Sequence, residues 1–142
     1  MPLKLIEPEA SGDTAAASTA GNNTWGVEAV GAHLSAYDGS GITVAVLDTG
    51  IDLTHPAFSG ANITRKNFTT EGDDDIHGHG THCAGTVFGQ DVNGMRIGVA
   101  RGVSHALIGK VLGEGQGSSA NLASAINWAV ENGANVISMS LG

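Results

Sequence analysis

The sequence is poor in cysteine, in aromatic side chains and in basic residues. Cys83 is the single cysteine among 142 residues, which excludes an intramolecular disulfide framework and leaves the cellular compartment open. Aromatic residues make up only 4% of the chain. Lys and Arg number 6 against 14 Asp and Glu, a formal net charge of −8. Because binding to nucleic acid or to an anionic membrane needs a basic face, we expect neither partner.

Long hydrophobic runs are also missing. No apolar run approaches the roughly 20 residues that span a bilayer. The first ten residues show no basic segment followed by an apolar core, so no signal peptide is recognisable and the localisation stays undetermined. Residues 9–24 are small and polar without an apolar period. We therefore predict a flexible leader over residues 1–24 and one folded domain over residues 25–142.

Three short apolar runs predict buried strands, at residues 41–47, 106–112 and 135–141. Between the last two, residues 119–133 carry apolar side chains at helical spacing, with Ser118 or Ser119 available as the cap and Gly133 at the end. Residues 79–88 form a shorter helical candidate. Strand, helix and strand within about 35 residues favour a βαβ crossover and hence an α/β fold with a parallel sheet.

Two stretches carry polar residues that are suited to chemistry. Asp48 stands where the first predicted strand stops, and functional groups gather at the carboxyl ends of parallel strands. His79 lies in a Gly-His-Gly-Thr-His-Cys block, and imidazole is the usual proton carrier near neutral pH. The alternatives are an aspartate that merely caps a turn and a glycine-rich turn with incidental histidines. His79 and His82 are three residues apart, but the H-E-x-x-H pattern is absent, so we predict no metal site.

Together with Val-Ile-Ser-Met-Ser-Leu-Gly at residues 136–142, these stretches resemble the subtilisin-like serine peptidases from about Trp25 onward. The resemblance implies a three-layer α/β fold, with a mostly parallel sheet flanked by helices, that is truncated here. It implies the activity of a serine endopeptidase, with Asp48 and His79 as the aspartate and histidine of the catalytic triad. His82 is then structural, and Cys83 lies beside the catalytic histidine.

The same resemblance assigns two substrate-binding edges. One edge is formed by Ser140, Leu141 and Gly142, and the opposite edge by Gly115, Gln116 and Gly117. An extended polypeptide substrate between two such edges adds as a β-strand through main-chain hydrogen bonds.

The sequence also departs from the family pattern. The motifs that carry the oxyanion asparagine (Ala-Gly-Asn) and the nucleophile (Gly-Thr-Ser-Met-Ala) do not occur in these 142 residues. We therefore expect an N-terminal half that is inactive by itself, with the serine supplied by a C-terminal half as partner. No cofactor is expected to be required. Calcium is left open: Ala57 follows His55-Pro56 where many relatives have a carboxylate, but Asp91, Asn93 and carbonyls of residues 90–96 offer oxygen ligands. Residues 73–75, three aspartates, are interpreted as a solvated loop.

Two other functions stay open at this point. A non-catalytic remnant of a subtilisin-like domain would bind peptides without cleaving them. Asp48-Thr49-Gly50 also fits a small homodimeric aspartic peptidase, in which each chain gives one carboxylate. That fold is all-β, so the helix expected over residues 119–133 opposes it.

Overall fold

The computed structural model describes residues 1–6, 21–114 and 116–142. Its centre is a parallel sheet of four strands in the order β3-β4-β2-β7. The strands of this sheet are β2 (Thr43–Asp48), β3 (Ile63–Asn67), β4 (His105–Lys110) and β7 (Val136–Ser138). The helices are α1 (Trp25–Ala29), α2 (His79–Phe88) and α3 (Ser119–Glu131), with 3-10 turns at Ala32–Leu34 and Pro56–Phe58.

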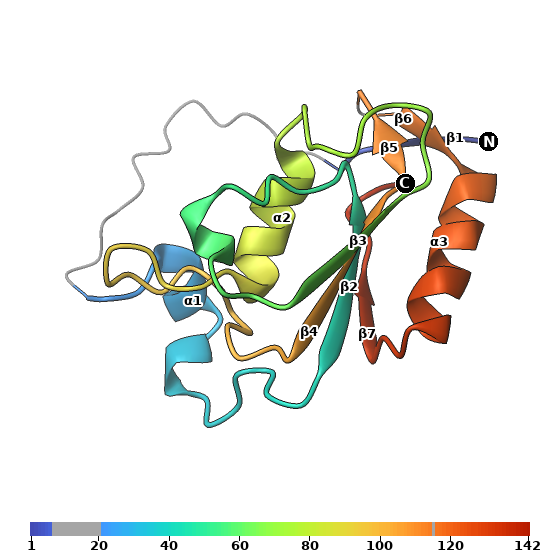
Figure 1. Ribbon diagram of the computed structural model, residues 1–142. Helices are drawn as coiled ribbons and strands as arrows, with labels where there is room; N and C mark the ends of the chain where they lie inside the picture. The colour runs from blue at the N-terminus through green and yellow to red at the C-terminus, as the bar shows by residue number, and fades with distance from the viewer. Residues whose placement is uncertain (7–20, 115) are drawn as a thin grey trace.

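The helices cover the sheet on both faces (Figure 1), with α1 and α2 on one side and α3 on the other. The alternation of side chains along β2 explains the two layers of core. Val44 and Val46 pack with Phe88 of α2, whereas Leu47 packs with Ala125 of α3. Both faces of the strand are therefore buried, as its unbroken apolar sequence predicted. The α/β fold with a parallel sheet flanked by helices is confirmed.

The helix predicted between the last two strands is confirmed as α3. Ser118 is its N-cap, and its hydroxyl oxygen accepts a hydrogen bond from the Asn121 N–H at 3.2 Å. Gly133 follows the helix with a φ of 83°, the left-handed conformation that glycine adopts without strain. The strands on either side, β4 and β7, both pair with β2, one on each edge. The crossover through α3 therefore passes over β2.

A second, antiparallel sheet contains the N-terminus of the chain. Its strand order is β1-β6-β5, and its strands are β1 (Pro2–Lys4), β5 (Leu112–Gly113) and β6 (Gln116–Ser118). This differs from the flexible leader predicted for residues 1–24, because residues 2–4 are paired strand. This strand could not be predicted from the sequence, because three residues carry no readable period and their partners lie more than a hundred residues away. Residues 7–20 lie outside the described residues.

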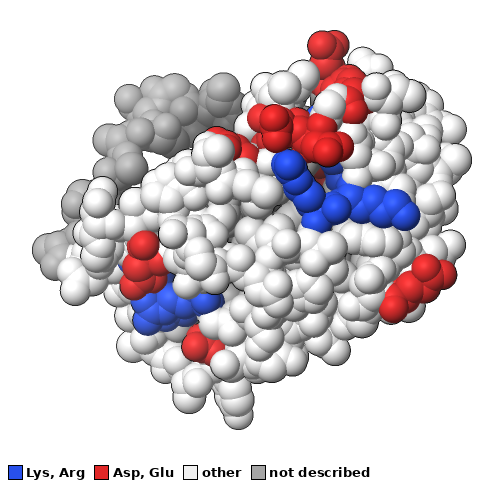
Figure 2. Space-filling model, viewed as in Figure 1, with Lys and Arg blue, Asp and Glu red and all other residues white. Residues whose placement is uncertain are grey.

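Charged side chains are few on the face drawn in Figure 2, where they gather in small groups of both signs. Arg65 pairs with Asp74 at 3.2 Å, and Arg101 pairs with Asp91 at 2.6 Å. Pairs this exposed contribute about 0–1 kcal/mol each. Within the described residues, no helix has both the length and the apolar character needed to cross a membrane.

The first turn of α2 lies directly against the end of β2. A Cβ placed on Gly80 would lie 2.3 Å from the Gly50 carbonyl oxygen, far inside van der Waals contact. Gly80 therefore lets α2 approach the backbone that follows Asp48. At Gly85, in the same helix, a Cβ would meet no described atom within 4 Å apart from its chain neighbours and the backbone of its own helix.

This contrast predicts opposite effects of two alanine substitutions in α2. We expect Gly80→Ala to lower the free energy of unfolding by about 1–3 kcal/mol, because backbone must move to admit the methyl group. Gly85→Ala should leave stability unchanged or raise it by up to about 1 kcal/mol through helix propensity. Urea unfolding followed by circular dichroism measures both. Equal effects of the two substitutions would contradict the close approach.

Candidate active site

Asp48 and His79 meet where β2 ends and α2 begins. Asp48 is 1% exposed, and its Oδ1 lies 2.8 Å from Nδ1 of His79. The same oxygen accepts a hydrogen bond from the Thr49 N–H at 2.7 Å. The second carboxylate oxygen, Oδ2, is buried and has no hydrogen-bond partner among the described residues. The structure thus brings together the two residues that the sequence analysis singled out, one fixed by a strand and one by a helix.

The N-terminal turn of α2 is held by two side chains from outside the helix. The N-cap is Gly78, which has no side chain to cap with. Asp75 substitutes for it: its Oδ1 accepts from the Gly78 N–H at 2.9 Å and its Oδ2 from the Thr81 N–H at 2.9 Å. Thr49 Oγ1 accepts from the Gly80 N–H at 2.8 Å and donates to Asp75 Oδ1 at 2.8 Å. Free N–H groups of the first turn are satisfied in this way, and His79 is fixed toward Asp48.

Asp75 is ionised at a lower pH than an ordinary aspartate. Burial alone would raise its pKa, but the hydrogen bonds from the Thr81 hydroxyl, the Gly78 and Thr81 N–H groups and the Thr49 hydroxyl lower the pKa overall. The nearby N-terminus of α2 favours the same negative charge. Sequence analysis missed this residue because it took the three aspartates together as a solvated loop. Only Asp73 and Asp74 are exposed.

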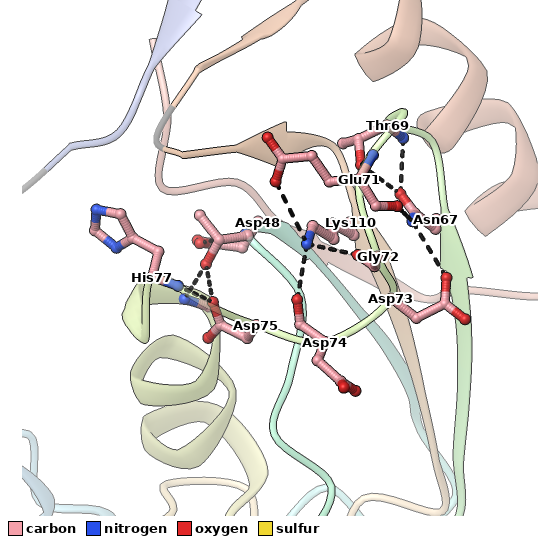
Figure 3. A network of polar contacts seen from close by, with 12 residues as sticks. Asp48, Asn67, Thr69, Glu71, Gly72, Asp73, Asp74, Asp75, His77 and Lys110 are labelled. Carbon is pink, nitrogen blue, oxygen red and sulfur yellow. Dashed lines mark hydrogen bonds and ion pairs between the residues drawn. The ribbon is translucent and has the colours of Figure 1, made fainter.

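Lys110, at the end of β4, fixes the acidic loop beside this site (Figure 3). It is 3% exposed, and its ammonium donates to the carbonyls of Gly72 and Asp74, both at 2.7 Å. The Glu71 carboxylate lies 3.9 Å away, so the carbonyls are its nearer partners. Lys110 is the register partner of Asp48 in the neighbouring strand. The one lysine in the apolar run expected over residues 106–112 thus has a structural role. It supplies the hydrogen-bond donor for carbonyl groups of the loop at residues 71–75.

The N-terminal strand β1 lies between the two edges predicted to bind substrate. On one side, residues 2–4 pair antiparallel with β6, which includes Gln116 and Gly117. On the other side, Lys4 N–H donates to Gly142 O at 2.7 Å and Gly142 N–H donates to Lys4 O at 2.8 Å. Leu5 opposes Leu141. Gly115 lies outside the described residues.

His79 touches the end of this strand through its other nitrogen. Ile6 N–H donates to Ser140 O at 3.0 Å, and Ile6 O lies 3.0 Å from His79 Nε2. A carbonyl and an ionised carboxylate both only accept hydrogen bonds. With Asp48 ionised, both contacts are hydrogen bonds together only when each ring nitrogen carries a proton, which is the imidazolium form of His79.

Cys83 is the third reactive side chain at this point. It lies one turn after His79 on α2, and its Sγ is 3.7 Å from His79 Nδ1. Burial and the charge of Asp48 raise the pKa of its thiol, against a hydrogen bond with Ser140 that lowers it. The thiol is therefore kept protonated near neutral pH. His82, by contrast, is exposed.

A comparison with protein families shows which family has this sequence pattern. The model of the subtilase family, peptidase family S8, matches residues 39–142, which include Asp48, His79 and both edges predicted to bind substrate. The chain belongs to the subtilase family. This confirms the resemblance drawn from the sequence. The hypothesis that Asp48-Thr49-Gly50 belongs to a homodimeric aspartic peptidase is therefore wrong. The helices and the parallel sheet also contradict the all-β fold of that class.

Similar subtilases include proteins from bacteria and fungi. The chain is 46% identical over 112 residues to the major intracellular serine protease of Bacillus subtilis, covering 73% of this chain and 35% of that protein. It is 39% identical over 136 residues to subtilisin-like protease 1 of Trichophyton equinum, covering 84% and 26%. The crystal structure of a psychrophilic subtilisin-like protease from Pseudoalteromonas sp. AS-11 superposes with a TM-score of 0.70 and 32% identity, covering 82% and 29%. The chain thus spans between about a quarter and about a third of the length of these relatives.

The calcium ligands suggested for this subtilase chain stay a prediction. Asp91, one of the suggested ligands, is engaged by Arg101 in an ion pair. A cation in the loop of residues 90–96 would compete with that arginine for the carboxylate.

Replacing Asp75 with asparagine tests whether it fixes α2. An amide cannot accept from all of its donors, so we expect Asp75→Asn to lower the free energy of unfolding at neutral pH by about 1–3 kcal/mol. Because the folded-state pKa of Asp75 is lowered, its contribution is present above the unfolded value near 3.9 and is lost as the pH falls below it. The difference between wild type and Asp75→Asn should therefore shrink on acidification.

Asp74→Asn is the matched control, because Asp74 is the neighbouring carboxylate but is exposed. Urea unfolding at several pH values measures both variants. A penalty for Asp75→Asn that does not change with pH, or one matched by Asp74→Asn, would contradict the capping role.

Proposed function

We propose that this chain forms the part of a serine endopeptidase site that holds the base and binds the substrate backbone. Asp48 and His79 are the aspartate and histidine of the triad, and the edges at residues 115–117 and 140–142 bind an extended polypeptide. The observation that carries the proposal is the partly buried Asp48–His79 contact of 2.8 Å, with a main-chain carbonyl at the other ring nitrogen. Membership of the subtilase family supports the same reaction class.

Each of the two residues has a chemical task in peptide-bond hydrolysis. Asp48 accepts the hydrogen bond from Nδ1, which fixes the tautomer of His79 and stabilises the imidazolium when it forms. Nε2 then takes the proton of the attacking hydroxyl and returns it to the leaving amine. The orphaned Oδ2 of Asp48 keeps negative charge beside the ring in a site with little water.

The groove between the two edges is proposed to bind substrate in the way that β1 lies there. Main-chain hydrogen bonds from both edges hold an extended strand regardless of its sequence. Side chains add selectivity: Leu3 and Leu5 pack against a buried cluster that includes Leu112 and Ala125, whereas Ile6 is 61% exposed. The groove therefore favours apolar residues at alternate positions before the carbonyl that meets His79.

The nucleophile is proposed to come from outside these 142 residues. No Gly-Thr-Ser-Met-Ala motif occurs in them, and Ser140 is already engaged as part of an edge. The 142-residue chain should therefore bind peptides without cleaving them by itself. The second candidate function is that of a peptide-binding module that does not cleave, even when it is joined to the rest of a subtilase domain. The occupied groove favours it, because strand binding does not need the serine.

Joining the chain to the rest of a relative tests the proposed function. Residues 1–142 replace the matching part of the Bacillus subtilis intracellular protease, and hydrolysis of a chromogenic peptide is followed. We expect an active chimera in which His79→Ala or Asp48→Ala lowers kcat on the order of 10⁴- to 10⁶-fold, the range known for a subtilisin triad. His82→Gln, an exposed change on the same helix, should retain activity. A folded chimera that binds peptide but has no activity would favour the second candidate.

Removing residues 1–6 should open the groove. We expect the peptide Met-Pro-Leu-Lys-Leu-Ile to bind the shortened chain, and to bind the full chain at least about tenfold more weakly, since a tethered strand competes at millimolar effective concentration. Fluorescence anisotropy of the labelled peptide measures both affinities.

Peptide variants control for non-specific binding. Changing Leu3 and Leu5 to aspartate in the peptide should abolish binding, whereas changing Lys4 to alanine should not, because the Lys4 side chain is exposed. Equal affinity for the full and shortened chains would show that β1 does not occupy the groove in solution.

A further inference from the structure

Three side chains with metal-binding atoms converge where α2 meets β2. The donor atoms of Asp48, His79 and Cys83 all lie within 4.8 Å of one another, and this is the single such group of three among the described residues. His79 and Cys83 are four residues apart on one helix, which puts them on the same face one above the other. Asp48 approaches from the end of the neighbouring strand. The spacing considered from the sequence, His79 with His82, is not the one that converges.

The separation of the sulfur and the ring nitrogen fits a tetrahedral ion. Zinc takes sulfur at about 2.3 Å and imidazole nitrogen at about 2.0–2.1 Å, which at the tetrahedral angle holds the two atoms about 3.6 Å apart. The observed separation of Cys83 Sγ and His79 Nδ1 is 3.7 Å. The third donor is also prepared, because Asp48 Oδ2 is buried and accepts no hydrogen bond from the described residues. Ligation through Oδ2 would leave the Thr49 hydrogen bond on Oδ1 in place.

The charges balance as well. A thiolate and a carboxylate carry two negative charges, so a divalent cation bound by them and by a neutral imidazole forms a neutral group. Neutrality matters here because Asp48 is 1% exposed and an uncompensated buried charge is costly. Starting from the doubly protonated ring, binding releases two protons, one from the Cys83 thiol and one from Nδ1. The ring keeps its proton on Nε2, and this N–H donates a hydrogen bond to the Ile6 carbonyl.

We propose that Asp48, His79 and Cys83 form a binding site for a thiophilic divalent cation, with Zn²⁺ as the physiological candidate and a water as fourth ligand. The bound ion takes Nδ1 of His79 and the carboxylate of Asp48, the two groups that the proton transfer requires. Binding of the ion therefore inhibits the proton transfer, and Cys83 is the ligand that lies outside the Asp48–His79 pair. The inhibition rests on the proposed function, whereas the binding does not.

Cobalt substitution on the full 142-residue chain tests the binding directly. We expect one equivalent of Co²⁺ to bind with a near-ultraviolet thiolate-to-cobalt charge-transfer band, and Zn²⁺ to displace it. Since losing even an outer-shell partner costs about 10–100-fold in metal affinity, Cys83→Ser should weaken Zn²⁺ binding at least about tenfold and abolish the band. Cys83→Ala serves as a second variant, and circular dichroism checks that each one folds. His82→Gln, the exposed neighbour of Cys83, should change neither measurement.

Alkylation gives a second readout that does not depend on activity. Zn²⁺ should slow modification of Cys83 by iodoacetamide, followed by mass spectrometry, in the wild type and in His82→Gln. Cobalt binding without the sulfur band, or Zn²⁺ affinity unchanged in Cys83→Ser, would overturn the site. In the active chimera, Zn²⁺ should inhibit the wild type more strongly than Cys83→Ser. Equal inhibition of the two would overturn the inhibitory role, while an inactive chimera that binds Co²⁺ through sulfur would refute only the proposed function.

Discussion

The close contact between the first turn of α2 and the end of β2 is the constraint on which the rest of the site depends. Gly80 has no Cβ, so the helix lies against the Gly50 backbone. Thr49 bridges the two elements by accepting from the Gly80 N–H and donating to Asp75. Without this approach, Asp48 at the strand end and His79 at the helix start would not share a hydrogen bond. The close approach of Gly80 to Gly50 and the two hydrogen bonds of Thr49 thus bring two separate motifs together as one partly buried pair.

The sequence was sufficient for this pair because both motifs are local and together they match the family pattern. The strand before Asp48 is an apolar run rich in β-branched residues, and α2 begins at the predicted residue, His79. The α3 helix was equally predictable, since its apolar spacing, its Ser118 cap and Gly133 all agree. The roles of Asp75 and Lys110 were not predictable. An aspartate in a run of three and a lysine inside an apolar strand are informative only once the fold brings the loop over the strand end.

The N-terminal strand was hidden from sequence reasoning for a different physical reason. Strand pairing is specified by partners, and the partners of residues 2–6 are residues 116–118 and 140–142, at the other end of the chain. A short strand of this kind has no core of its own and gains order only from edges that already exist. The same edges were predicted as the substrate groove. The structure therefore gives an example of how that groove holds an extended backbone, with apolar side chains at alternate positions and a carbonyl at His79.

The position of Cys83 shows how closely general-base chemistry and metal chemistry can coincide. A base needs an imidazole oriented by a carboxylate in a place with little water, and a zinc site needs the same two groups plus one more ligand. In this chain the additional ligand lies one helical turn away, with its sulfur 3.7 Å from the nitrogen that faces Asp48. Asp48 also has one buried oxygen that no described residue satisfies. Keeping the thiol protonated preserves Nδ1 for Asp48, whereas a cation that displaces both protons converts the base into a ligand. The identity of the residue at position 83 therefore decides whether the pair can be blocked by a thiophilic ion.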